Sequence, residues 1–291
     1  MTVCTICPRR CGADREAAAG FCRSGTDPKL ARAALHLWEE PCISGTRGSG
    51  TVFFSGCSLR CVYCQNGKIS AGNYGKAVSL DRLREIYSEL IARGAHNINL
   101  VNPTHWAEAV ISSLKGGLPV PVVYNTGGYD SVGTLRRLEG LVDVYLPDMK
   151  YADGALAGQL SAAPDYPETA RAAIREMVRQ TGPFVLDDDG LLVRGTLIRH
   201  LILPGHMENT LRVIDWAADS FPPGTVLFSL MSQYTPCGDL SRWPELQRRL
   251  TQEEYDLCRE YLDGSGIEDG FFQELSSAEE EYIPPFDCSG V

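Results

Sequence analysis

The chain has 291 residues, of which 44% are hydrophobic, and it carries a formal net charge of −10. This length and apolar content allow a single domain with a sizeable core, about the size of an α/β barrel. An acidic chain lacks the basic surface that neutralises phosphates, so we do not expect nucleic-acid binding. The N-terminus has no signal-peptide character and no stretch approaches a membrane span, so we expect a cytoplasmic protein without membrane association.

Residues 1–44 form a cysteine-rich segment. Four of the eleven cysteines gather near its start, at Cys4, Cys7, Cys11 and Cys22. In a chain without a secretion signal, such cysteines predict metal ligation rather than disulfides. Four thiolates can close a site for zinc or for a second iron–sulfur cluster, and the metal would stabilise a segment with little apolar surface. The alternative is four reduced thiols packed as a cap on the rest of the protein.

Residues 45–265 show alternating strand and helix patterns. Strands are predicted at 51–54, 98–101, 120–124, 142–146, 191–203 and 226–230, and helices at 80–93 after a Ser79 cap, 106–114, 132–138, 169–179, 211–218 and 243–262. Short apolar runs separated by helices are typical of a parallel sheet. Six such units are fewer than the eight of a closed barrel, so we predict an α/β fold, a partial (β/α)6 TIM-like barrel. Residues 266–291 are expected to form an acidic C-terminal tail.

Three further cysteines lie directly after the first predicted strand of the barrel, at Cys57, Cys61 and Cys64. Their C-x-x-x-C-x-x-C spacing can hold three irons of a cubane [4Fe-4S] cluster and leave the fourth iron open for another ligand. The alternatives are a zinc knuckle or a disulfide pair. Zinc usually takes four protein ligands, and the nearest histidines, His36 and His96, show no knuckle spacing to the three cysteines.

The three-cysteine run, with Tyr63 before its last cysteine, resembles the cluster motif of the radical S-adenosylmethionine (SAM) superfamily. The resemblance extends along most of the chain and is closest to uncharacterised homologues of the pyruvate formate-lyase activating enzyme. It is carried by Cys-Pro-Arg-Arg-Cys-Gly at 7–12, Gly-Ser-Gly at 48–50, Asn-Pro-Thr-His at 102–105, Asp-Met-Lys at 148–150, Leu-Pro-Gly-His at 203–206 and Ser-Gln-Tyr at 232–234. In that superfamily the open iron binds SAM, and an electron from the reduced cluster cleaves SAM to a 5′-deoxyadenosyl radical.

The ends of the predicted strands carry polar residues that suit a SAM site. Asn125, Thr126, Asp148 and Lys150 offer donors for a carboxylate and acceptors for an ammonium group and ribose hydroxyls. The resemblance assigns Thr126, Asp148 and Lys150 to the methionine part of SAM, Tyr63 to the adenine, and Gln233 to the cofactor. Where the superfamily usually has Gly-Gly-Glu, this chain has Asn102-Pro103-Thr104, so Asn102 and Thr104 are substitutes by position only.

The resemblance implies an enzyme that abstracts a hydrogen atom from a protein, such as a glycyl radical enzyme, or from a peptide. It also implies a reducing partner such as flavodoxin or ferredoxin. His105 and His206 follow predicted strands and Arg199 lies near the end of one, and these three residues are candidates for substrate contacts. Two alternatives stay open: modification of a small molecule, and a metal-binding scaffold or redox protein without radical chemistry.

Overall fold

The computed structural model describes residues 3–275 and 284–291. Within these ranges the strands are β1 Lys29–His36, β2 Ser49–Phe54, β3 Lys76–Ala77, β4 Ile98–Val101, β5 Val122–Thr126, β6 Val144–Pro147, β7 Val185–Leu186, β8 Leu192–Leu201, β9 Leu227–Met231 and β10 Gly270–Phe272. The α-helices are α1 Pro41–Ser44, α2 Leu80–Ala92, α3 Ala107–Ser113, α4 Val132–Leu138, α5 Gly154–Ser161, α6 Tyr166–Thr181, α7 Met207–Ser220 and α8 Gln252–Asp263. Short 3-10 helices occupy Thr104–Trp106 and Pro244–Gln247.

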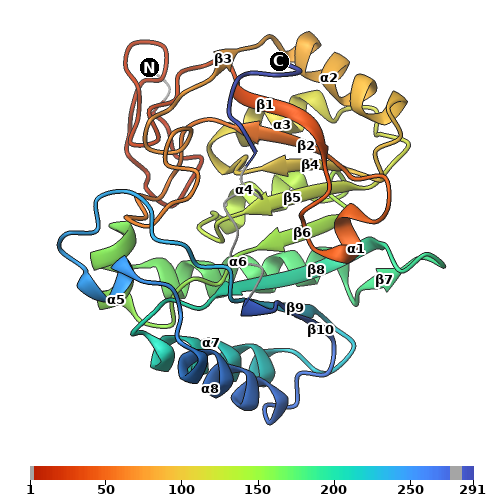
Figure 1. The fold of residues 1–291 in the computed structure, drawn as a ribbon. Coiled ribbons are helices and arrows are strands. Elements are labelled where there is room, and N and C mark those ends of the chain that lie inside the picture. The colour runs from red at the N-terminus through yellow and green to blue at the C-terminus, as the bar shows by residue number, and fades with distance from the viewer. Residues whose placement is uncertain (1–2, 276–283) are drawn as a thin grey trace.

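One curved sheet runs through the molecule in the order β10-β9-β8-β6-β5-β4-β2-β1-β3. From β2 to β10 every neighbouring pair is parallel, and β1 is antiparallel to both β2 and β3. The six predicted strands correspond to β2, β4, β5, β6, β8 and β9, in the predicted order. The partial barrel predicted from the sequence is therefore confirmed, with a seventh parallel strand, β10, at one edge (Figure 1).

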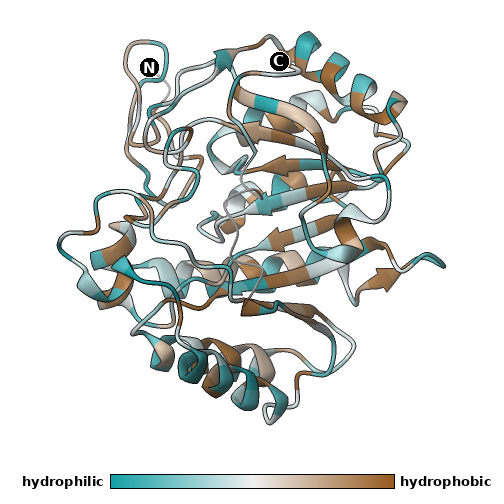
Figure 2. Cartoon of the chain, in the orientation of Figure 1, coloured by the Kyte–Doolittle hydropathy of each residue, from teal (hydrophilic) through white to brown (hydrophobic). Residues whose placement is uncertain are grey.

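The helices cover the outside of the sheet, and Figure 2 shows hydrophobic colour concentrated along the strands. Helix α2 begins at Ser79, whose side chain accepts from the backbone N–H of Arg82 as the predicted cap. Its buried Leu83, Ile86 and Leu90 pack in the same core cluster as strand residues of β2 and β4. At the amino ends of the strands, α1 places Cys42 and Ile43 against the barrel interior and closes its floor.

Two predicted elements differ from the structure. The single helix expected over 243–262 is wrong, because the chain forms a 3-10 turn at Pro244–Gln247 and begins α8 after Thr251, which makes a capping box with Glu254. A proline at the first position of a turn and a strong N-cap both favour a new start. Strand β10 lies within the segment expected as an acidic tail, of which residues 276–283 fall outside the described residues.

The other end of the sheet also differs from the sequence pattern. Strand β1 lies within the segment predicted as cysteine-rich, and it forms the antiparallel partner of β2. The last residues of the chain bond to β1, through Cys288 N–H to Ala31 O and Ala33 N–H to Ser289 O. The chain end therefore covers the exposed side of β1, as Figure 1 shows.

Among the described residues, no helix combines the length and the apolar character that a membrane crossing needs.

Gly128 provides a test of how tightly the carboxyl ends of β5 and β6 are packed. Its φ is +78°, and a Cβ at this position would overlap the carbonyl oxygen of Asp148. We expect Gly128→Ala to lower the free energy of unfolding by about 2–4 kcal/mol, from left-handed strain and overpacking together. Chemical denaturation measures the loss.

Gly133→Ala is the matched control, because Gly133 lies inside helix α4 with no atom within 4 Å of its added Cβ. This change should stabilise the protein by up to about 1 kcal/mol. Equal stability of the two variants would contradict the packing described here.

Candidate functional site

The loop after β2 carries Cys57, Cys61 and Cys64 and is fixed at both of its sides. Gly56 N–H donates to Ile69 O at 2.8 Å, which closes the base of the loop. Val62 N–H donates to Leu160 O at 2.9 Å, which ties the loop to the end of α5. The three cysteines are therefore presented by a loop with its own backbone hydrogen bonds, which we call the cluster loop (residues 56–70).

Each of the three sulfurs has a hydrogen-bonding neighbour. Leu59 N–H lies 3.3 Å from Cys57 Sγ, Ser161 Oγ lies 3.0 Å from Cys61 Sγ, and Ser70 Oγ lies 3.2 Å from Cys64 Sγ. Donors of this kind stabilise the negative charge of a thiolate and tune iron–sulfur clusters. The donor set therefore fits a [4Fe-4S] cluster with three protein ligands.

Burial disfavours ionisation of the Cys57 and Cys61 thiols in the absence of a metal. It raises the pKa of Cys57 to about 12, with the neighbouring Cys61 and Cys64 adding to the effect. It also raises the pKa of Cys61, although the Lys150 ammonium opposes this. A metal must therefore displace protons from these two thiols when it binds.

Opposite the cluster loop, Asp148 lies between two cations. Its Oδ2 is 2.5 Å from Lys150 Nζ, and its Oδ1 accepts from Arg199 Nε at 3.0 Å. Burial alone would raise the pKa of Asp148, but the two cations hold it below its usual value. Burial alone would lower the pKa of Lys150, but the Asp148 carboxylate raises it above its usual value. Both charges therefore persist inside the barrel.

Arg199 extends this network to a second set of acceptors. Its guanidinium donates to Asn125 Oδ1 at 2.6 Å and to Glu39 Oε2 at 3.2 Å, and Glu40 Oε2 lies 3.8 Å away. Burial raises the pKa of Glu39, and it raises the pKa of Glu40 to about 6, although Arg199 opposes both shifts. Arg199 thus contacts one carboxylate just after β6 and two from the segment before α1.

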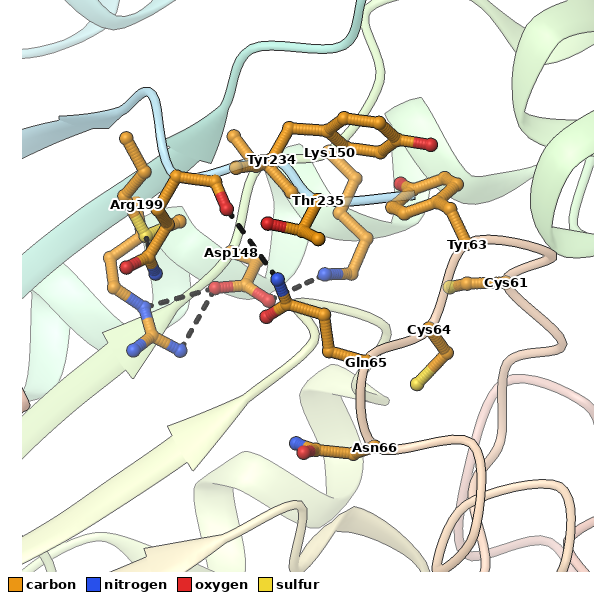
Figure 3. Close-up of a pocket in the computed structure, with 13 residues that line it drawn as sticks. Cys61, Tyr63, Cys64, Gln65, Asn66, Asp148, Lys150, Arg199, Tyr234 and Thr235 are labelled. Carbon is orange, nitrogen blue, oxygen red and sulfur yellow. Dashed lines mark hydrogen bonds and ion pairs between the residues drawn. The ribbon is translucent and has the colours of Figure 1, made fainter. Parts of the chain in front are cut away.

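A cavity of about 230 Å³ lies between the cluster loop and this charged network (Figure 3). Cys61 and Cys64 lie on one side of it, and Asp148 and Arg199 on the other. Its lining comprises Cys61, Tyr63, Cys64, Gln65, Asn66, Asp148, Lys150, Arg199, Leu201, Met231, Gln233, Tyr234 and Thr235. An adjoining hollow of about 150 Å³ shares Gln65, Asn66, Arg199 and Gln233 and adds Glu39, Trp38 and Asn125.

The structure brings many of the predicted site residues together at this cavity. Tyr63, Asp148, Lys150, Arg199 and Gln233 line it beside two of the three cysteines. Four lining residues were not predicted as site residues, although they lie directly after predicted ones. Gln65 and Asn66 follow Cys64, and Tyr234 and Thr235 follow Gln233. Glu39 was also missed, because only the fold brings the segment before α1 under Arg199.

Other predicted residues lie just outside the lining of the cavity. Thr104 and Thr126 are buried, with their hydroxyls 3.1 Å apart, and Thr126 donates to Asp130 at 2.5 Å. Asn102 has a left-handed φ of +58°, and its side-chain amide donates to Gly56 O at 2.6 Å. Thr104 and Thr126 therefore stabilise the strand ends, and Asn102 stabilises the start of the cluster loop, from outside the cavity lining. His206 pairs with Glu245 at 3.4 Å, also away from the cavity lining.

Two buried histidines fix the backbone on the two sides of the site. His105 Nε2–H donates to Ser55 O at 2.8 Å, just before the cluster loop. His200 Nδ1–H donates to Met149 O at 2.6 Å, between Asp148 and Lys150, while its Nε2 accepts from Thr210 at 2.9 Å. Burial lowers the pKa of each histidine to about 4. Both are therefore neutral at physiological pH and positioned as structural donors.

The comparisons with known proteins agree with this site. A family described as a 4Fe-4S single cluster domain matches residues 44–114, which include the cluster loop. The chain is 29% identical over 267 residues to the uncharacterised protein MJ0674 of Methanocaldococcus jannaschii, covering 88% of this chain and 73% of that protein.

Solved structures resemble this chain at low sequence identity. SuiB of Streptococcus suis, bound to its precursor peptide SuiA, superposes with a TM-score of 0.50 at 10% identity over 78% of this chain. The chain spans about half of SuiB, 49% of its length. A domain of the pyruvate-formate lyase-activating enzyme from Bacteroides vulgatus gives a TM-score of 0.42 at 15% identity, covering 58% of this chain and 92% of that domain.

The matching 4Fe-4S family includes the three-cysteine motif and SuiB shares the partial barrel, in agreement with the sequence resemblance to the radical SAM superfamily. The family match supports the predicted [4Fe-4S] cluster, since it includes Cys57, Cys61 and Cys64. The structure adds a cavity beside the cysteines, lined by charged groups of both signs.

The two histidines predict a loss of stability in acid. In the unfolded chain a histidine has a pKa near 6.5, so between pH 6.5 and 4 the unfolded state binds more protons and stability falls as the pH falls. Each histidine should account for about 2 kcal/mol between pH 7 and pH 5. His200→Asn keeps a donor near Met149 but removes the titrating group. Between pH 7 and pH 5 we expect its free energy of unfolding to fall by about 2 kcal/mol less than that of the unmodified protein.

Urea unfolding of the metal-free protein at the two pH values measures the difference. His206→Asn is the control, since His206 is partly exposed at the start of α7. An unchanged pH dependence in His200→Asn would show that His200 is not held neutral in the folded state.

Proposed function

We propose that this protein is a radical SAM enzyme that binds SAM in the cavity beside Cys61 and Cys64 and abstracts a hydrogen atom from a protein or peptide. The observation that carries the proposal is the placement of the charged pair Asp148 and Lys150 across the cavity from the cluster loop. A cofactor with an ammonium and a carboxylate group needs donors and acceptors at that position.

A reduced [4Fe-4S] cluster held by Cys57, Cys61 and Cys64 would supply the electron for reductive cleavage of SAM, and SAM bound in the cavity would supply the group that abstracts the substrate hydrogen. The protein's part is to position and shield these groups. Lys150 Nζ reaches the cavity from the strand end and is the donor best placed for a carboxylate. Asp148 is the acceptor for an ammonium or a hydroxyl group.

The rings of Tyr63 and Tyr234 border the same cavity, with centroids 6.2 Å apart. Tyr63 is fixed by its hydroxyl, which lies 2.7 Å from the hydroxyl of Tyr151. A flat heteroaromatic group such as adenine packs favourably against aromatic faces. Gln65, Asn66 and Thr235 supply neutral donors and acceptors around it.

A protein or peptide substrate is supported by the form of the site. The cavity continues into the second hollow past Gln65 and Gln233, which gives an extended, polar entrance rather than one closed pocket. SuiB, which shares the fold, is known with a precursor peptide bound. We place glycyl radical activation and peptide modification within this proposal, and a flavodoxin- or ferredoxin-like donor as the source of the electron.

The first test is anaerobic production of 5′-deoxyadenosine after reconstitution with iron and sulfide, reduction, and addition of SAM. We expect product from the unmodified protein and none above background from the combined Cys57→Ala, Cys61→Ala and Cys64→Ala variant, because the cluster loses all three protein ligands. Zinc at these cysteines in place of iron would refute the proposal.

The role of Lys150 is tested by Lys150→Met, which keeps the length of the side chain and removes its charge. We expect SAM to bind about 10- to 100-fold more weakly, the range for loss of one hydrogen bond to a charged group. Anaerobic calorimetry measures the affinity, and the visible absorption of the cluster checks that it is still loaded. Lys115→Met, at an exposed position, is the control. Equal affinities in the two variants would remove Lys150 from the site.

The substrate class is tested by isotope transfer, since abstraction places a substrate hydrogen in 5′-deoxyadenosine. The enzyme is incubated separately with deuterated protein and deuterated small-molecule fractions of a cell extract. Deuterium from the protein fraction supports the proposal. Deuterium from the small-molecule fraction alone would replace the macromolecular substrate with a small one.

A further inference from the structure

The segment at residues 3–25 is ordered against the barrel without the usual means of ordering a chain. It contains no helix or strand, and its buried residues are Cys7, Cys22 and Ser24 alone within these described positions. All eleven cysteines of the protein are free thiols, so no disulfide holds it. A stretch this long with so little apolar burial needs another source of stability, because fixing its backbone costs entropy at every residue.

Its four cysteines converge on one place. Cys4 N–H donates to Ala13 O at 3.0 Å, and Gly12 N–H to Cys4 O at 3.3 Å, so the chain folds back and brings Cys4 beside Cys11. A turn between them, closed by Arg10 N–H to Cys7 O at 3.1 Å, presents Cys7. The chain then returns through Gly20, beside which Cys11 Sγ and Cys22 Sγ both lie.

The sulfurs also interact with one another and with backbone donors. The thiol of Cys7 is within electrostatic range of Cys4, Cys11 and Cys22, and the side chain of Cys4 lies beside that of Cys11. The backbone N–H of Arg9 lies near the Cys7 thiol, and those of Ala13 and Phe21 lie near the Cys11 thiol. Backbone N–H groups directed at several clustered sulfurs are the surroundings that stabilise metal-bound thiolates.

This segment lies directly on the cluster loop, on the carboxyl-end side of the strands in Figure 1. Arg9 Nε donates to Ser58 O at 2.7 Å, and Arg60 Nη2 donates to Phe21 O at 2.6 Å. Both guanidinium groups also stack on the Phe21 ring, at 4.1 and 4.6 Å from its centroid. At Gly56, an added Cβ would come within 2.5 Å of Cys22 O, so the two backbones touch next to Cys57.

We propose that Cys4, Cys7, Cys11 and Cys22 bind a second metal centre with four thiolate ligands, zinc or a cubane iron–sulfur cluster, and that this centre holds residues 3–25 against the cluster loop. In the described residues no group of three or more potential ligands has the spacing of a bound ion, at the quartet or at the cluster loop. Metal binding draws such thiols together as it orders the chain. The contacts through Arg9, Phe21 and Cys22 then transmit that order to the loop that carries Cys57 and Cys61.

The test measures metal in the full chain and does not involve SAM, so it is independent of the proposed function. The combined Cys57→Ala, Cys61→Ala and Cys64→Ala variant leaves the quartet as the remaining thiolate cluster. After anaerobic reconstitution, separately with zinc alone and with iron plus sulfide, this variant should retain about one zinc or about four irons per chain. The arm that gives the stable, stoichiometric product under competition identifies the metal.

Two further variants complete the design. Adding Cys4→Ser, Cys7→Ser, Cys11→Ser and Cys22→Ser should abolish the remaining metal, whereas adding Cys288→Ser should leave it, since Cys288 lies at the other end of the chain. In a background with an intact cluster loop, the four serine changes should make residues 3–25 at least about tenfold faster to cleave by protease. Circular dichroism checks that the barrel is still folded.

The proposal is overturned if the variant without the cluster-loop cysteines holds no more zinc or iron than the variant lacking both cysteine sets. It is also overturned if that metal is lost equally on Cys288→Ser, since binding would then not belong to the quartet. In either case residues 3–25 would be a thiol-containing cap held by its arginine contacts alone.

Discussion

The buried charges inside this barrel depend on one cation, the guanidinium of Arg199. It bonds to Asp148 beyond β6, to Asn125 on β5 and to Glu39 before α1. Removing one partner from a buried charge pair costs about 3–5 kcal/mol, because the remaining charge keeps its desolvation penalty. Without Arg199, the Glu39 and Asp148 carboxylates would lie close together inside the protein without a shared cation. Arg199 therefore links Asp148 and Asn125 at the strand ends to Glu39 and gives the two carboxylates a common cation.

The site is held from outside the barrel by neutral groups. His105 and His200 each donate to a backbone carbonyl beside a functional segment, at Ser55 before the cluster loop and at Met149 between Asp148 and Lys150. The Tyr166 hydroxyl adds to the second of these supports, since it donates to Asp148 O at 2.7 Å and accepts from Lys150 N–H at 2.9 Å. Charged side chains thus face the cavity, while uncharged ones outside the barrel fix the backbone that carries them.

The sequence predicted the parts of this arrangement that depend on local pattern. Strand β4 and helix α4 were predicted with the bounds that the structure shows. A short apolar strand and an amphipathic helix can both be recognised from the hydrophobic pattern of their own residues. Strand β1 was not predicted, since its alanines and leucines favour a helix and only pairing with β2 makes it a strand. Strand β10 was missed for the same reason, as its three residues gain their place from β9.

The same distinction applies to the candidate site. Asp148, Lys150 and Gln233 could be placed from the sequence, because residues that follow parallel strands meet at one edge of the sheet. Thr104 lies just after β4 and Thr126 is the last residue of β5, but their hydroxyls lie in a buried network with Asp130, which itself bonds to Tyr124 at 3.0 Å. Which side of a strand end faces the cavity depends on the twist of the sheet and on the neighbouring loop, and the amino-acid sequence alone gives neither. Glu39 could not be placed at all before the fold brought it to Arg199.

The charges at the cavity bear on the proposed binding of a zwitterion. In the structure the Asp148 carboxylate is already paired with both Lys150 and Arg199. An anion alone would have to compete with Asp148 for Lys150, and a cation alone would have to compete with Lys150 for Asp148. A ligand with both charges can insert between them, exchanging one ion pair for two and leaving the net charge of the buried site unchanged. Since uncompensated charge is what burial penalises most, this exchange favours an amino-acid-like group over either ion by itself.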